Sequence, residues 1–87
     1  MELEITRNFA RKYKKKSPEK QEKVEKTLRL LETDPHYPGL HTHKVQGTYG
    51  IFECYVDDTL RVTFQYGDNC ILLRNSCEHD AVLRGLP

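Results

Sequence analysis

The chain of 87 residues is long enough for one domain and too short for two. Charged residues make up 31% of it and hydrophobic residues 37%, so we expect a small core and a highly charged surface. No apolar run approaches the roughly 20 residues that cross a bilayer, and the opening MELEITRNF has no signal-peptide pattern, which predicts a cytoplasmic protein with no membrane partner.

The first third of the chain predicts a strand followed by a helical hairpin. Residues 2–5 alternate polar and apolar, the period of a half-buried strand. Thr6 is expected to cap a helix that ends at Lys15. Ser17, which is followed by proline, signals a second helix that ends at about Glu32. Two helices joined by so short a link predict a helical hairpin.

The rest of the chain predicts a loop and an antiparallel meander. Residues 35–50 are rich in proline and glycine and indicate a loop, with a short extended piece at 43–46. Three strands are expected at 51–56, 60–66 and 70–76, joined by tight acidic or glycine-containing turns. The predicted fold class is therefore α+β.

Side-chain alternation divides these three strands into an apolar and a polar face. In the last strand it places Asn75 on the apolar face and Ser76 on the polar face. A polar face of this kind is usually only solvated. The residues expected side by side on it are Glu53, Tyr55, Arg61 and Arg74.

The charges and the cysteines narrow the choice of partners. Residues 1–33 contain ten Lys/Arg and six Glu, whereas residues 34–87 contain four Lys/Arg and seven Asp/Glu, so a polyanion would bind the basic first part. Cys54, Cys70 and Cys77 match no metal-ligand spacing, and we expect reduced thiols, no metal and no cofactor.

The polar residues are of the types that metal-free RNA cleavage needs. A base must take the proton of the 2′-hydroxyl, an acid must protonate the leaving 5′-oxygen, and a cation must stabilise the phosphate. His36 and His41, in the loop, are expected to be plain surface residues. A polar face with scattered histidines would give the same pattern without any site. The residues that could border one concave surface are His43, Tyr55, Arg61, Arg74 and His79.

Several segments of the chain resemble the RelE/ParE toxin superfamily of bacterial toxin–antitoxin systems. They are ITRNFARKYKK with SPEKQEKVEKTLRLLETDP, then HKVQGTYGIFECYVDDTLRVTFQ, then DNCILLRNSCEHDAVLRG. The HKVQG and EHDAVLR parts are most similar to the YafQ-type branch of RelE-like mRNA interferases. The resemblance implies a β-α-α-β-β-β fold with a helical hairpin on a curved, mainly antiparallel sheet. It also implies ribosome-dependent, metal-free cleavage of mRNA through the 2′-hydroxyl, and a cognate antitoxin that forms a hetero-oligomer with the toxin.

The same resemblance assigns roles to individual residues. His79 would be the general acid, His43 the base, and Arg61 a contact to the scissile phosphate. Tyr55 stands where relatives carry a basic residue or a histidine, and Asp58 lies within one residue of a YafQ-type aspartate. Contacts to RNA phosphates, in the ribosome or the mRNA, are expected from Arg74, Lys44, Lys12, Lys15, Lys16 and Lys20; the alternative for the helix lysines is that they only solvate two short helices.

Two departures from the pattern keep other functions open. Tyr55 removes a positive or imidazole group, and Cys77-Glu78 replaces a glycine and a threonine before His79. One alternative is a ParE-type inhibitor of DNA gyrase, which shares the fold but has no nuclease chemistry. Another is a weak or inactive homologue that mainly binds its antitoxin.

Overall fold

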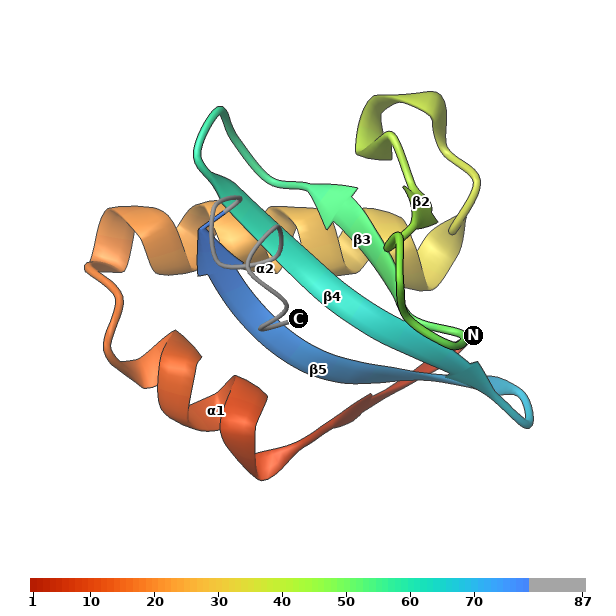
Figure 1. The fold of residues 1–87 in the computed structure, drawn as a ribbon. Helices are drawn as coiled ribbons and strands as arrows, with labels where there is room; N and C mark the ends of the chain where they lie inside the picture. The colour runs from red at the N-terminus through yellow and green to blue at the C-terminus, as the bar shows by residue number, and fades with distance from the viewer. Residues whose placement is uncertain (79–87) are drawn as a thin grey trace.

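The structure is a computed structural model that describes residues 1–78, so the predicted acid His79 lies outside the described residues. The described part combines two helices with a five-stranded sheet, which confirms the α+β class (Figure 1). Its elements are β1 (Glu2–Ile5), α1 (Arg7–Lys14), α2 (Pro18–Thr33), the 3-10 turn η1 (Pro38–Leu40), β2 (His43–Lys44), β3 (Phe52–Tyr55), β4 (Leu60–Gly67) and β5 (Cys70–Glu78).

Both helices begin at the caps that the sequence predicts. The Thr6 hydroxyl accepts a hydrogen bond from the Phe9 amide (3.2 Å), and the Ser17 hydroxyl accepts one from the Lys20 amide (3.3 Å). Thr6 also donates to the Leu73 carbonyl at 2.7 Å, which ties the start of α1 to β5. The observed ends of the helices differ from the predicted ends by one residue each.

The sheet has the strand order β1-β5-β4-β3-β2. The predicted meander is present: β3 pairs antiparallel with β4, and β4 pairs antiparallel with β5. The short extended piece is the edge strand β2, which pairs antiparallel with β3. The first strand, β1, is an edge strand that runs parallel to β5, and the two helices lie in the connection from β1 to β2 at the opposite edge of the sheet (Figure 1).

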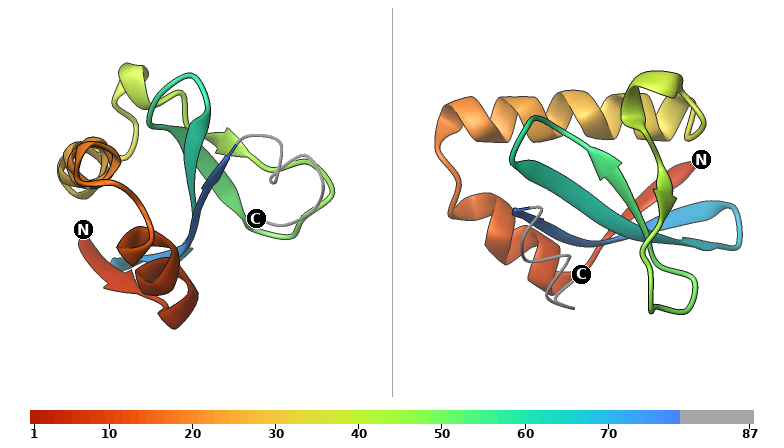
Figure 2. Two further views of the ribbon diagram at one scale, coloured as in Figure 1. Left: turned by 90° about the vertical axis from the view of Figure 1, so that its left-hand side faces the viewer. Right: turned by 45° about the horizontal axis from the view of Figure 1, so that its top comes forward.

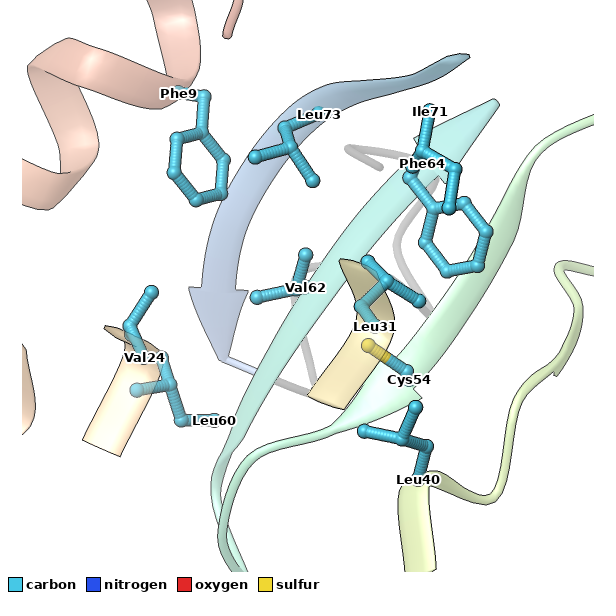
Figure 3. Packing of buried hydrophobic residues seen from close by; sticks show 10 residues of the cluster. All are labelled: Phe9, Val24, Leu31, Leu40, Cys54, Leu60, Val62, Phe64, Ile71 and Leu73. Carbon is cyan, nitrogen blue, oxygen red and sulfur yellow. The ribbon is translucent and has the colours of Figure 1, made fainter. Parts of the chain in front are cut away.

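Both helices lie on one side of the sheet, and the loop after β2 projects on the other side (Figure 2). The core fills the space between helices and sheet, and Phe9 (α1), Val24 (α2) and Leu31 (α2) point into it (Figure 3). The sheet and η1 supply the other buried members of this cluster: Leu40, Cys54, Leu60, Val62, Phe64, Ile71 and Leu73.

A β-bulge in β5 changes which side chains share a face. Phe64 pairs with Leu73, but its neighbour Thr63 pairs with Asn75, so β5 has one extra residue between the two pairs. Asn75 therefore shares a face with Thr63, and Ser76 pairs with the core residue Val62. The predicted faces of Asn75 and Ser76 were wrong, because strict alternation assumes uninterrupted pairing and one extra residue reverses every later position.

Within residues 1–78, no helix is both long and apolar enough to cross a membrane.

Candidate active site

The face of the sheet opposite the helices, here called the polar face, carries polar side chains in two rows that run across the strands. Because directly paired residues share a face, the register defines both rows. The first row is His43, Glu53, Thr63 and Asn75. The second row is Tyr55, Arg61 and Cys77.

His43 and Glu53 form a close pair in the first row. His43 Nε2 lies 2.6 Å from Glu53 Oε1, and the two side chains are 58% and 4% exposed. His43 Nδ1 lies 2.8 Å from the His41 carbonyl oxygen and donates to it in the tautomer that carries a proton on Nδ1. Both ring nitrogens thus have a polar partner, Glu53 at Nε2 and the His41 carbonyl at Nδ1.

Glu53 Oε2 and the Thr63 hydroxyl are buried and have no hydrogen-bond partner within the described part of the chain. They are neighbours in the first row, since Glu53 pairs directly with Thr63. Buried polar atoms without partners are costly, and they are concentrated where a protein binds something or performs chemistry. The carboxylate beside His43 thus has unused hydrogen-bonding capacity.

Arg61 and Tyr55 form the centre of the second row. The guanidinium carbon of Arg61 lies 4.9 Å from the centre of the Tyr55 ring, a cation–π contact. The Tyr55 hydroxyl donates to Asp58 Oδ1 at 2.9 Å. That hydrogen bond raises the pKa of Tyr55, with a smaller contribution from burial. The hydroxyl therefore stays protonated at neutral pH and is no candidate base.

The turn between β3 and β4 holds Arg61 in place. Asp57 Oδ1 accepts hydrogen bonds from the amides of Thr59 (2.9 Å) and Leu60 (2.8 Å). Burial acts to raise the pKa of Asp57, but these amides and the charge of Lys20 outweigh it and leave the pKa below its ordinary value. The Asp57 carbonyl in turn accepts a hydrogen bond from Arg61 Nη1. The carboxylate shapes the turn, and the turn positions the arginine.

Arg74 lies on the polar face but away from Arg61. It occupies the bulge and donates from Nη1 to Gln65 Oε1. Arg61 pairs with Cys77, three residues further along β5 than Arg74, which separates the two backbones by about 10 Å at the usual strand rise. Lys44 pairs with Phe52, so it lies on the opposite face from its neighbour His43. Neither residue adjoins the pair of His43 and Glu53.

The four lysines of the helical hairpin that were predicted to bind RNA meet at one place. Lys12, Lys15, Lys16 and Lys20 line a hollow of ≈ 500 Å³, here called the lysine hollow, between the hairpin and the ends of β4 and β5. Cys77 also lines it, so it adjoins the second row. Lys16 differs from the others, because its ammonium donates to the carbonyls of Ser76 (2.7 Å) and Lys12 (3.3 Å) and burial lowers its pKa.

Two residues of this region were missed by the sequence analysis. Alternation placed Glu53 on the polar face but did not predict that this carboxylate is buried. His41, expected to be a plain surface residue, lies edge-on to Tyr55 with ring centres 5.9 Å apart. No local signal in the sequence predicts the burial of Glu53 or the contact of His41 with Tyr55. Within the described residues, no cluster of three or more His, Cys, Asp or Glu side chains is placed to hold a metal ion.

Comparisons with known proteins identify the fold. No protein-family model matches the sequence, and no curated protein matches it either. Solved structures match over nearly their whole length. YafQ from Escherichia coli superposes with a TM-score of 0.76 at 15% identity, covering 93% of this chain and 96% of YafQ. A YoeB/ParE toxin from Agrobacterium tumefaciens gives 0.75 at 15% identity, covering 91% and 99%. YafQ in the E. coli DinJ–YafQ toxin–antitoxin complex gives 0.73 at 18% identity, covering 92% and 93%.

The chain therefore has the fold of the RelE/ParE-like toxins, as the resemblance implied.

Proposed function

We propose that this protein is the toxin of a toxin–antitoxin pair and an endoribonuclease that cleaves mRNA on the ribosome. The observation that carries the proposal is the arrangement on the polar face: a buried carboxylate paired with a histidine lies one row from an arginine, in a fold shared with YafQ and YoeB-type toxins. An acid–base pair beside a phosphate-binding cation is what RNA cleavage without a dedicated nucleophilic side chain requires.

Arg61 is the proposed phosphate ligand. Its contacts to Tyr55 and to the Asp57 carbonyl fix the guanidinium plane, and fixed donors stabilise developing phosphate charge without reorganisation. Apart from Nη1, no nitrogen of this guanidinium has a hydrogen bond to the described part of the chain. These free N–H groups are available to the scissile phosphate. Arg74 would contact a neighbouring phosphate further along the face.

The pair of His43 and Glu53 is the proposed base. Glu53 fixes His43 through Nε2, which leaves Nδ1 as the nitrogen that meets the substrate. The 2′-hydroxyl would displace the His41 carbonyl and give its proton to Nδ1 of the neutral imidazole. The 2′-oxygen then attacks the adjacent phosphorus, and the bond to the 5′-oxygen breaks. His79 remains the proposed acid on the basis of the sequence resemblance.

The lysine hollow is the proposed contact to ribosomal RNA. Lysine side chains gathered at one place bind phosphates as point charges, and such binding weakens steeply with salt. Lys12, Lys15 and Lys20 would make these contacts, whereas Lys16 joins α1 to β5. The partner would be a cognate antitoxin, as DinJ is for YafQ in the complex with this fold.

The direct test is to add the purified protein to a translating extract and map the new 5′ ends on the mRNA. New ends that appear only while ribosomes translate would support the proposal. A parallel assay measures supercoiling by DNA gyrase. Inhibition of gyrase without new 5′ ends would instead establish a ParE-type inhibitor, and no effect in either assay would point to an antitoxin-binding homologue.

A further inference from the structure

A second hollow, here called the aromatic hollow, lies where η1 faces the edge of the sheet. Its volume is ≈ 410 Å³, in the range of sites that hold small planar ligands. Tyr37, the residue before η1, lines one side of it, and Phe52 and Tyr66 line it from β3 and β4. The two tyrosines are 45% and 39% exposed, so aromatic surface is available to a ligand.

The wall of this hollow on the sheet is rigid. Phe52 and Tyr66 touch edge-to-face with ring centres 5.2 Å apart, and both pack on Phe64, which is fully buried. On the facing wall, Tyr37 lies over Gly39, where an added Cβ would come within 2.7 Å of the Tyr37 ring. The position of that ring therefore depends on glycine. Aromatic side chains held in this way are preorganised for stacking.

His41 connects the aromatic hollow to the polar face. His41 lines the hollow, and its ring lies edge-on to Tyr55, whose own ring contacts the Arg61 guanidinium. A strand of RNA whose phosphate lies at Arg61 can thus continue past His41, over the edge strand β2, into the hollow. His36 and Thr42 add polar groups to the lining.

We propose that the aromatic hollow binds one unpaired nucleobase of the RNA, next to the nucleotide whose phosphate lies at Arg61. This inference rests on the proposed function and adds a specificity site to it. Proteins read single-stranded RNA by stacking splayed bases on aromatic rings and by hydrogen bonds to the base edges. Tyr37 and Tyr66 supply the stacking surface, and His36 and His41 supply donors and acceptors for the edge.

The test uses the full chain and a short single-stranded RNA with a 2′-deoxy nucleotide at the cleavage position, so that it binds without being cut. Tyr37→Leu and Tyr66→Leu are compared with Tyr49→Leu, a control at a loop position that is 97% exposed. Loss of one stacked base, about 1–3 kcal/mol, corresponds to binding about 5- to 150-fold weaker in the two hollow variants and unchanged in the control. Thermal unfolding confirms that each variant is folded.

Amide chemical-shift mapping with the same RNA separates the possible failures. Shifts at both Arg61 and Tyr66 support the inference. Shifts at Arg61 alone, with both hollow variants binding like wild type, overturn the inference and leave the proposed function standing. Absence of RNA binding anywhere overturns the inference, whereas the proposed function stands or falls with the 5′ ends mapped in the translating extract. If the RNA leaves the hollow unshifted but a co-expressed antitoxin shields Tyr37 and Tyr66, the hollow is a protein interface and the inference is wrong.

Discussion

Replacement of Glu53 by glutamine tests whether His43 and Glu53 together act as the general base. The amide has nearly the same size and fits the same buried place, but it cannot balance the charge of a protonated His43. Since a positioned acid–base group contributes about 10²–10⁴-fold, we expect the cleavage rate of Glu53→Gln to fall by about that factor. The free energy of unfolding should change little, because the substitution removes the charge of a buried carboxylate, one oxygen of which has no hydrogen-bond partner in the described part of the chain.

Substitution of the other member of the pair, His43, should behave differently. His43→Ala leaves the Glu53 carboxylate buried without its partner, and we expect a loss of about 1–3 kcal/mol in the free energy of unfolding as well as a loss of cleavage. For a chain of this size, about 1 kcal/mol corresponds to a fall of about 4–8 °C in the melting temperature. The control is Glu22→Gln, at an exposed position of α2.

The assay is single-turnover cleavage with the protein in excess over ribosomes that carry the mRNA, together with thermal unfolding of each variant. Cleavage by Glu53→Gln within threefold of wild type, while His43→Ala is inactive, would refute the role of the carboxylate. If Glu53→Gln and His43→Ala lower the free energy of unfolding equally, the argument is wrong that the buried Glu53 carboxylate depends on the exposed His43 as its partner.

Three further predictions follow from the turn and the thiols. Tyr55→Phe keeps the ring under Arg61 and loses only the hydroxyl, so cleavage should stay within about threefold if the ring positions the arginine, and a loss of about 100-fold would give the hydroxyl a chemical role. Asp57→Asn should lower stability at pH 7 because the pKa of the folded carboxyl lies below its ordinary value of 3.8. The difference from wild type should be full above pH 3.8 and shrink as the pH falls through the lower pKa of the folded carboxyl. A difference in thermal unfolding that stays constant from about pH 7 to about pH 2 would contradict the argument. A thiol reagent at about pH 8 should modify Cys70 in the folded protein and Cys54 only on unfolding. Burial encloses Cys54 and raises the pKa of its thiol to about 12. Modification of Cys54 before unfolding, detected by mass spectrometry, would contradict this.

The sequence predicts the elements of this fold because their signals are local. The hydroxyls of Thr6 and Ser17 each accept a hydrogen bond from the amide three residues later, and both helices begin there. Tight turns likewise separate the strands of the meander. Alternation within each strand then locates Arg61 and Tyr55 on one face, because these residues lie in strands that pair without interruption.

The finer arrangement of the site depends on contacts between distant segments. The extra residue in β5 appears only when β5 pairs with β4, and it moves Asn75 to the polar face and separates Arg74 from Arg61. The burial of Glu53 and the contact of His41 with Tyr55 likewise require the loop around β2 to lie against the sheet. None of these contacts leaves a pattern within a single segment.

The central claim is that the polar face binds and cleaves mRNA, and Arg61→Ala tests it most directly. Purified wild type, Arg61→Ala and the control Arg7→Ala, an exposed position of α1, are each added to a translating extract, and the 5′ ends are mapped and counted. Loss of one preorganised donor of transition-state charge costs about 10²–10³-fold, so new ends should appear with wild type and Arg7→Ala and fall by that factor with Arg61→Ala. Equal numbers of ends with all three proteins, or none with wild type, would contradict the claim.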